Sequence, residues 1–236
     1  MTQTTEHKKQ IAIFGGSFNP PHYGHFVAAF YARHYLDLDE VWMLVTPQNP
    51  HKDPNSYAPL EDRMELCRIM ADGHPWLIPI DVEKDMETTE TANTLRTLTA
   101  QNPDIEFTWV MGADNLTNFH RWSNWEEIIE NYKMLILSRP GEGDAAMQSP
   151  AARYARHLHV KDPLDMRGRE NGWTFVNVEK FDISSSDILR RMRAGERNIK
   201  ELFEKVEKHM LERGLFGLTE KPATPPPQAS RSFDPK

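Results

Sequence analysis

Short apolar runs alternate with longer amphipathic stretches through most of this 236-residue chain. Runs dense in β-branched and aromatic residues predict buried strands at residues 10–14, 41–45, 77–82, 107–111, 132–137 and 173–178. Apolar residues at helical spacing predict helices over residues 26–36, 60–70 and 202–211, and two more that open at residues 91–95 and at the serines 184–186. Because strands that alternate with helices form right-handed βαβ units, we expect an α/β fold with a doubly wound parallel sheet.

The expected domain covers residues 10–218. Residues 1–9 are polar and residues 219–236 are rich in proline, so both ends are expected to be disordered. The pattern is weakest over residues 142–171, where glycine, proline and mixed charge predict a long connection with one short helix near residues 151–157. Pro79 cannot donate to a strand ladder, so its strand is expected at a sheet edge or a bulge.

The most informative stretch is FGGSFNPPHYGH at residues 14–25, which leads from the first expected strand into the first expected helix. Gly15 and Gly16 permit a positive φ and let a ligand approach the backbone closely. A helix start also offers N–H groups and the positive end of the helix dipole to phosphate. His22 and His25 are three residues apart, so both can project from the first turn and donate hydrogen bonds to a leaving pyrophosphate. A glycine pair alone is common, whereas the full string is far more specific.

Two further stretches place polar groups where a nucleotide could bind. Asp114 follows the strand at residues 107–111, at the carboxyl end where a parallel sheet can receive a ribose hydroxyl. Ser184, Ser185 and Ser186 precede an apolar-periodic run, so their hydroxyls are expected to cap a helix whose N–H groups favour phosphate. Both placements suit a phosphorylated ligand.

The composition narrows the class of partner. Lys and Arg number 28 against 35 Asp and Glu, a net charge of −7 without a strongly basic block, which argues against nucleic acid or an anionic membrane. The single cysteine, Cys67, excludes an intramolecular disulfide, and its helical setting predicts a buried thiol. No apolar run approaches the roughly 20 residues of a membrane span, and the polar start lacks a signal peptide's apolar centre, so the cytoplasm is expected. The oligomeric state stays open, and a homo-oligomer is compatible with the sequence.

Residues 14–25 resemble the G-G-[ST]-F-[DN]-P-x-H-x-G-H signature of the nucleotidyltransferase superfamily, and within it of the bacterial nicotinate-nucleotide adenylyltransferases. Further segments that match the family extend the resemblance from about residue 11 to residue 217. The resemblance implies a Rossmann-like doubly wound parallel sheet of the nucleotidyltransferase type. It also implies adenylyl transfer from ATP to nicotinate mononucleotide in NAD biosynthesis, which yields deamido-NAD and pyrophosphate.

The resemblance assigns roles to individual residues, with His22 and His25 as the catalytic pair. The residues it implies for ATP binding are Gly15, Gly16, Ser17, Phe18, His22, His25, Asp114, Arg139, Ser184, Ser185, Ser186 and Arg190. The residues it implies for mononucleotide binding are Asn19, His51, Lys52, Thr91 and Trp122. In this assignment Thr91 contacts the carboxylate of the pyridine ring, and Trp122 stacks on the ring.

Three of these assignments leave alternatives open. The family's arginine falls on Leu189 here, so Arg190 or Arg191 would have to reach the phosphates in its place. Thr91 is equally suited to be a plain helix N-cap. Trp125 competes for the pyridine ring, and either tryptophan is also a common packing residue.

The expected reaction is direct in-line attack of the mononucleotide phosphate on the α-phosphorus of ATP, without a covalent intermediate. Mg²⁺ bound through the substrate phosphates is the expected cofactor, and it requires no cage of protein carboxylates. Two rival hypotheses remain. A phosphopantetheine adenylyltransferase or a cytidylyltransferase would share the first signature but should lack the later motifs together. A non-catalytic nucleotide-sensing domain would more naturally have lost one of the histidines.

Overall fold

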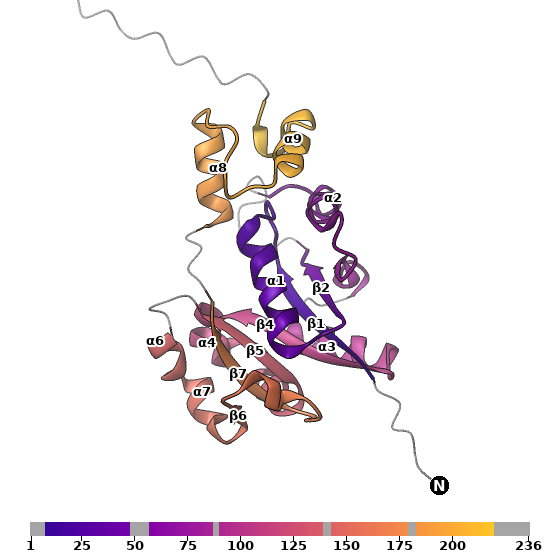
Figure 1. The fold of residues 1–236 in the computed structure, drawn as a ribbon, viewed down its shortest axis with the longest axis vertical. Coiled ribbons are helices and arrows are strands. Elements are labelled where there is room, and N and C mark those ends of the chain that lie inside the picture. The colour runs from indigo at the N-terminus through magenta and orange to yellow at the C-terminus, as the bar shows by residue number, and fades with distance from the viewer. Residues whose placement is uncertain (1–7, 48–56, 87–89, 139–142, 179–182, 220–236) are drawn as a thin grey trace, which may run out of the picture.

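The computed structural model describes residues 8–47, 57–86, 90–138, 143–178 and 183–219. Its centre is a seven-stranded sheet in the order β3-β2-β1-β4-β5-β7-β6 (Figure 1), and every pairing in it is parallel. The strands are β1 Lys9–Gly16, β2 Glu40–Val45, β3 Leu77–Ile80, β4 Ile105–Gly112, β5 Lys133–Ser138, β6 His159–Val160 and β7 Gly172–Asn177. The sheet is therefore all-parallel over its described length.

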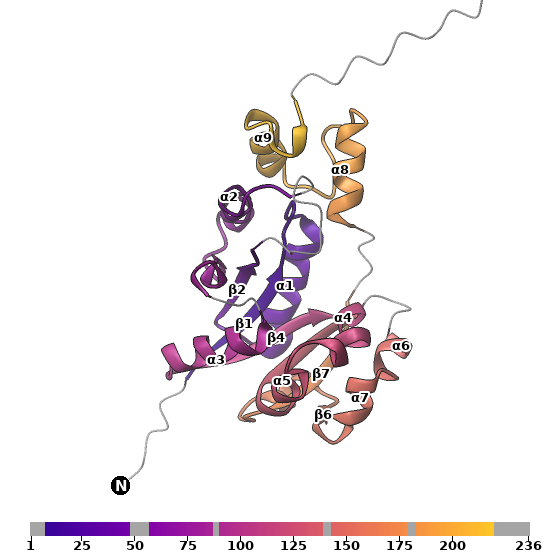
Figure 2. The ribbon, with the colours of Figure 1, turned by 180° about the vertical axis from the view of Figure 1, so that it is seen from behind.

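Helices cover both faces of the sheet, as the two opposite views show (Figures 1 and 2). In the described residues they are α1 Tyr23–Leu36, α2 Leu60–Ala71, α3 Thr91–Gln101, α4 Ala113–Asn118, α5 Trp125–Asn131, α6 Gly143–Met147, α7 Pro150–Tyr154, α8 Ser185–Arg193 and α9 Glu204–Glu212. Helices α1, α2, α8 and α9 share one hydrophobic cluster with one face of the sheet. Helices α3 to α7 share a second cluster with the opposite face.

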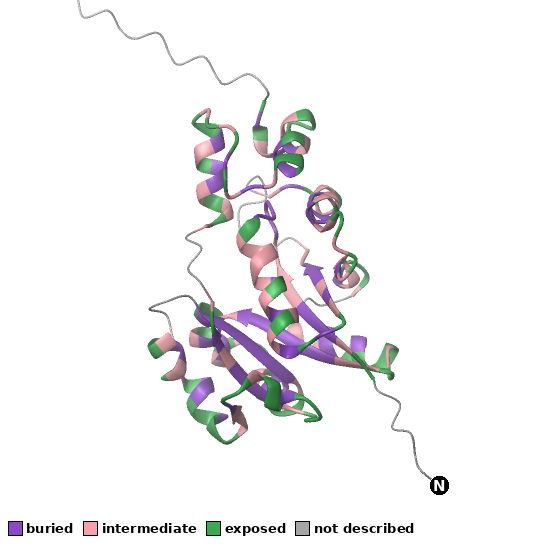
Figure 3. Ribbon diagram, viewed as in Figure 1, coloured by how far each residue is buried: buried purple, intermediate pink, exposed green. Residues whose placement is uncertain are grey.

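The alternation of side chains along β1 explains why its apolar run is continuous. Ile11 and Ile13 pack into the cluster of α3 to α7, whereas Ala12 packs into the cluster of α1 and α2. All three side chains are fully buried, as are most positions in the central strands (Figure 3). A strand covered on both faces has no solvent side, so polar residues do not interrupt it.

The order of the strands places a reversal point between β1 and β4. From β1 the chain winds outward through β2 to β3, and it then returns to β4 and continues outward on the other side. The carboxyl ends of β1 and β4 therefore diverge into connections that leave in opposite directions. Ligands bind in the crevice outside such a switch point in open α/β sheets.

Most of the elements predicted from the sequence are confirmed, including the doubly wound parallel sheet. The strand with Pro79 is β3, the outermost strand on its side, so its expected edge position is correct. Thr91 as a helix N-cap is wrong, because Glu90 occupies the cap position and Thr91 is already the first helical residue. The sequence pattern also missed α4, α5, α6 and β6, since six, seven, five and two residues are too few to show a clear periodicity.

The single cysteine behaves as predicted. Cys67 is fully buried in α2, and burial raises the pKa of its thiol, so it is a packing residue. Gly214 takes the left-handed conformation (φ 64°) directly after Arg213, which ends α9 in the usual way for glycine. Within the described ranges, the helices are too short or too polar to cross a bilayer.

Candidate active site

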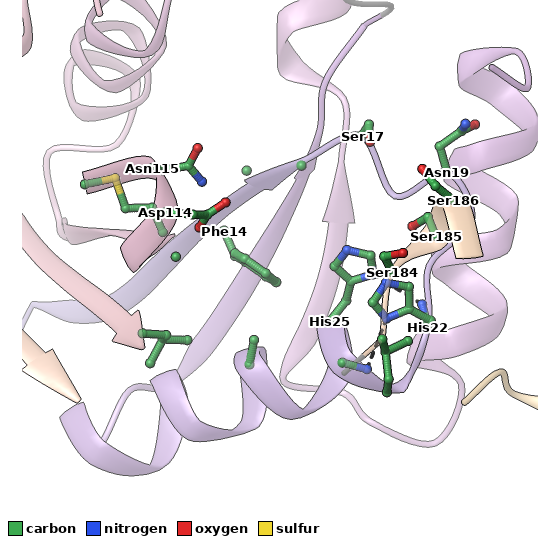
Figure 4. Close-up of a pocket in the computed structure, with 18 of the residues that line it drawn as sticks. Phe14, Ser17, Asn19, His22, His25, Asp114, Asn115, Ser184, Ser185 and Ser186 are labelled. Atoms are coloured by element: carbon green, nitrogen blue, oxygen red, sulfur yellow. Dashed lines mark hydrogen bonds between the residues drawn. The ribbon is translucent and has the colours of Figure 1, made fainter. Parts of the chain in front are cut away.

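A cavity of about 880 Å³ lies at the carboxyl ends of β1, β4 and β5, between the first turns of α1 and α8. It coincides with the switch point of the sheet. Ten of the residues predicted from the sequence line it, several of which face one another in Figure 4: Gly15, Gly16, Ser17, Asn19, His22, His25, Asp114, Ser184, Ser185 and Ser186. Two signatures separated by about 160 residues in the chain thus form one site.

His22 and His25 form the start of α1 through a reciprocal capping arrangement. The Nδ1 atom of His22, the N-cap residue, accepts the N–H of Gly24 at 3.1 Å. The Nδ1 atom of His25 accepts the N–H of His22 at 3.2 Å. The two imidazole rings stack with their centroids 3.8 Å apart. Since an accepting Nδ1 carries no hydrogen, each neutral ring holds its proton on Nε2, which is the donor it can offer to a ligand.

The sequence predicts that the backbone N–H groups at the start of α1 bind phosphate, but in the structure they bond to other groups of the protein. The N–H of Tyr23 donates to the carbonyl of Glu201 at 3.0 Å, and the N–H of Gly24 is held by the His22 ring. The N–H groups of His25 and Phe26 both donate to the carbonyl of His22, at 2.9 and 3.3 Å. The first-turn N–H groups are therefore already used, and the side chains that this helix start contributes to the cavity lining are the two imidazoles.

Gly24 between the two histidines leaves room for the stacked rings. A Cβ atom at this position would lie 3.0 Å from both Cε1 and Nδ1 of His22. Any side chain there would push the His22 ring away from the backbone N–H that it caps. The glycine of the H-Y-G-H string therefore preserves the orientation of the two stacked histidines.

The glycine pair at the end of β1 is required because there is no room for a Cβ atom, and not because the backbone has a positive φ. Neither Gly15 nor Gly16 has a positive φ, whereas Phe18 does, at 45°. A Cβ atom on Gly15 would lie 2.7 Å from the indole of Trp109, and one on Gly16 would lie 3.0 Å from the ring of Phe18. Close packing against these rings is what requires glycine here. Phe18 itself is 1% exposed, so it supports the loop from the core and does not line the cavity.

The start of α8 is capped by a serine and tied to the signature loop. The Ser184 Oγ atom accepts the N–H of Asp187 at 3.1 Å. The Ser185 hydroxyl donates to the carbonyl of Pro20 at 2.9 Å, which joins α8 to the loop before α1. In the described part of the chain, no hydrogen bond uses the N–H groups of Ser185 and Ser186. These two donors stand in the first turn of a helix that opens on the cavity.

Two other predicted residues approach the cavity from different segments. Asp114 lies in the first turn of α4, directly after β4, as its position behind a buried strand predicted. Asn19 is 8% exposed, and its Oδ1 atom accepts the N–H of Ala58 at 3.0 Å. That bond fixes the orientation of the amide of Asn19 at the cavity wall.

Several predicted residues do not meet in this cavity. Thr91 and Trp122 are half-buried and lie outside its lining, Trp122 packing edge-on against Phe119 and Trp109 at centroid distances of 5.2 and 6.4 Å. Arg190 is also outside the lining, and its side chain, 72% exposed, pairs with Asp187. The predicted residues His51, Lys52 and Arg139 lie outside the described residues.

Arg193 is a cavity residue that the sequence prediction missed. Leu189 and Arg193 lie four residues apart on α8, and both line the cavity. Among the described residues of the lining, Arg193 alone has a lysine or arginine side chain. Arg191, the other candidate considered, instead pairs with Glu196 at 2.5 Å and Glu201 at 3.0 Å. The i, i+4 relation to Leu189 was the available signal, because residues at that spacing share a helix face.

The cavity offers oxygen ligands for a divalent cation without a dedicated protein cage. Its described lining includes the carboxylate of Asp114 and the hydroxyls of four serines, Ser17, Ser184, Ser185 and Ser186. Over the described residues, no group of three His, Cys, Asp or Glu side chains gathers closely enough to hold a metal ion. Mg²⁺ commonly uses one or two carboxylates together with substrate phosphates, so the lining fits a metal that arrives with a nucleotide.

Fold and site together define a nucleotide-binding transferase of the Rossmann-like class. The sequence model of the cytidylyltransferase-like family matches residues 13–191. The chain is 40% identical over 189 residues to a probable nicotinate-nucleotide adenylyltransferase of Rhizobium meliloti, covering 78% of this chain and 99% of that protein. It is 44% identical over 181 residues to one of Ruegeria pomeroyi, covering 75% and 84%. The chain belongs to the nicotinate-nucleotide adenylyltransferases, within the cytidylyltransferase-like family.

The fold has matches among solved structures. The nicotinic acid mononucleotide adenylyltransferase of Plasmodium falciparum, solved in complex with NaAD, superposes with a TM-score of 0.69. That match covers 90% of this chain and all of the other at 18% sequence identity. At this identity the likeness concerns the fold alone, and it agrees with the nucleotidyltransferase type expected from the sequence.

Proposed function

We propose that the cavity between α1 and α8 carries out the reaction of the chain's family, adenylyl transfer from ATP to nicotinate mononucleotide in NAD biosynthesis. The observation that carries the proposal is the pair of imidazoles whose Nδ1 atoms are held by the backbone at the switch point of the sheet. The products are deamido-NAD and pyrophosphate. The mononucleotide phosphate attacks the α-phosphorus of ATP in line with the departing pyrophosphate, so no protein nucleophile is needed.

The two histidines stabilise the negative charge that grows on the leaving pyrophosphate. Each neutral ring offers an Nε2–H, and the backbone contacts at Nδ1 keep His22 and His25 from rotating away. Donors that are fixed before the reaction lower the barrier because they need not reorganise in the transition state. In this arrangement the imidazoles act as hydrogen-bond donors, and no proton transfer to or from them is required.

The start of α8 supplies the second half of the phosphate site. The N–H groups of Ser185 and Ser186 and the positive end of the helix dipole favour the triphosphate. Arg193 adds a full positive charge on the same helix face, in place of Arg190. Asp114, at the end of β4, accepts a ribose hydroxyl, and Arg139 remains a predicted phosphate contact.

Divalent metal use is suggested by the family, and Mg²⁺ is the ion we propose. It would be held by the phosphates of ATP, with Asp114 and the serine hydroxyls as the protein oxygens nearest to them. When bound, it neutralises part of the phosphate charge and so assists the attack of one anion on another. The roles given above to His22, His25 and α8 require no direct bond to the metal.

The mononucleotide is proposed to occupy the side of the site beyond β1 and β4. Asn19, His51, Lys52, Thr91 and Trp122 are its predicted contacts. Asn19 supports this placement, because its amide is fixed by Ala58 at the cavity wall. Thr91 is the first residue of α3 and not its N-cap, which supports a role for its hydroxyl other than capping, namely the proposed bond to the nicotinate carboxylate.

A pyrophosphate-release assay with Mg-ATP and a panel of acceptors tests the proposal. Nicotinate mononucleotide should be the best acceptor, with nicotinamide mononucleotide and phosphopantetheine as the comparisons. A site that offers only hydrogen-bond donors pairs fully with a carboxylate, whereas the NH₂ of an amide leaves one of those donors unpaired. We therefore expect a preference in kcat/KM of at least about a hundredfold for the acid. A ratio near one would contradict acid selectivity, and turnover of phosphopantetheine alone would contradict the assignment.

A further inference from the structure

Arg63 of α2 is a buried cation directly behind the signature loop. It is 1% exposed, and its guanidinium donates to three backbone carbonyls. The Nε atom donates to Ala58 at 2.9 Å, and one terminal nitrogen donates to both Ser17 and Thr46 at 2.8 Å. The three acceptors belong to the signature loop, the residue after β2 and the segment that leads into α2. A planar guanidinium can join three such segments, whereas a lysine has only a single nitrogen to offer.

The residues that Arg63 holds form part of the cavity wall. Ser17, Asn19 and Tyr57 all line the cavity. Ser17 accepts from Arg63 directly, the Tyr57 ring lies 5.8 Å from its guanidinium carbon, and Asn19 is bonded to Ala58, another Arg63 acceptor. The guanidinium therefore supports this wall from behind without lining the cavity itself.

The charge of Arg63 is also uncompensated within the described residues, where no carboxylate lies within ion-pair distance of it. Burial lowers the pKa of the guanidinium from its usual value, yet arginine stays protonated in proteins. Burying a cation that bonds only neutral carbonyls is costly for stability. Such a charge acts at longer range than an exposed one, because the surrounding protein screens it less than water does.

We propose that Arg63 is a positioning residue for adenylyl transfer, which fixes the wall at Ser17, Asn19 and Tyr57 and attracts the anionic substrates through its buried charge. The inference rests on the proposed function of the cavity. Arg63 makes two contributions, its hydrogen bonds and its charge, and different variants remove them separately. The three hydrogen bonds hold the wall in the reactive geometry and so affect kcat. The charge acts on the phosphates as they bind and so affects KM and its dependence on salt.

The test compares Arg63→Lys and Arg63→Met with the control Arg68→Met. Arg68 lies on the same helix, but its side chain is 57% exposed and pairs with Glu65 at 3.3 Å, so its loss should leave both kinetic constants unchanged. Lysine keeps the charge and loses the planar fork, and methionine loses both. Melting curves and circular dichroism establish the folded fraction, to which all rates are normalised. If Arg63→Met does not fold, Arg63→Gln takes its place as the uncharged variant.

We expect Arg63→Lys to lower kcat about tenfold at nearly unchanged KM, since a misplaced wall of this kind costs rate more than binding. We expect Arg63→Met to lower kcat at least as much, to raise the KM for ATP about tenfold and to flatten the salt dependence of kcat/KM. A lower melting temperature with wild-type kcat, KM and salt dependence per folded molecule would overturn the inference, because a purely structural residue gives that result. A wild-type protein without activity on nicotinate mononucleotide would instead defeat the proposed function.

Discussion

The starts of α1 and α8 face the same cavity, and they present different groups to it. At α1 the first-turn N–H groups are used by Glu201, by the His22 ring and by the His22 carbonyl, and the imidazoles stand at the cavity. At α8 the Ser184 side chain caps only the N–H of Asp187, and the two preceding N–H groups open on the cavity. One helix start therefore offers side chains, and the other offers backbone.

The difference shows that a phosphate motif at a helix start does not by itself say which atoms bind. A serine is small enough to cap its helix and leave space for an anion at the backbone. A histidine that caps a helix fills that space with its own ring and puts Nε2 forward in place of the N–H groups. We infer that the imidazoles at α1 donate to the leaving pyrophosphate, whereas the backbone N–H groups at α8 bind the triphosphate of ATP.

The largest expected effect is loss of the histidine donors. His22→Ala and His25→Ala should each lower kcat by about 10²–10³, the usual result of removing one preorganised donor. His22→Asn is the matched control for folding, because asparagine is a good N-cap and can replace Nδ1 at the N–H of Gly24. It should recover the roughly 1 kcal/mol of stability that the alanine variant loses with the cap, without recovering activity. Turnover numbers and urea unfolding curves for the three variants check this.

Near-normal turnover in any folded histidine variant would contradict the claim that the imidazoles at the start of α1 are the donors that the reaction uses. Recovery of activity in His22→Asn would also contradict it, because it would show that the cap, and not the imidazole, is what the reaction needs.

A smaller effect is expected from the charge on α8. Arg193→Leu should raise the KM for ATP about tenfold and change the KM for the mononucleotide much less, since a charge-assisted bond to phosphate is lost. Arg190→Leu should leave the KM for ATP near the wild-type value, because Arg190 is exposed and paired with Asp187 outside the cavity. Steady-state kinetics with each substrate varied in turn distinguish the two arginines. If Arg190→Leu raised the KM for ATP and Arg193→Leu did not, Arg190 would be the phosphate contact, as the sequence predicted.

Much of the fold and half of the site could be predicted from the sequence, for identifiable reasons. Strand and helix periods were clear wherever an element was buried on a whole face, as in β1 or α2. The cavity residues in the two signatures were predictable because each signature is contiguous in the chain. The family resemblance implied that both signatures bind ATP, whereas the contact that joins them, from Ser185 to Pro20, is known only from the structure.

The residues that were missed depend on packing. Arg63 has the helical spacing of the apolar face of α2, four residues before Cys67 and seven before Met70, but only the structure shows three carbonyls converging on it. Arg193 lies beyond the second signature, and its relevance emerges once α8 is known to continue through it. The reason for glycine at residue 15 was misjudged, because the indole of Trp109 that excludes a side chain comes from another strand.

Nuclear magnetic resonance of the imidazole nitrogens tests the central claim most directly. The chain has 10 histidines, so spectra of ¹⁵N-histidine-labelled protein are assigned by comparison with His22→Asn and His25→Asn. The capping arrangement predicts that both Nδ1 atoms are unprotonated, that both Nε2 atoms carry the proton, and that pyrophosphate shifts the two Nε2 signals. Protonated Nδ1 atoms, or Nε2 signals that do not move at saturating pyrophosphate, would contradict the account.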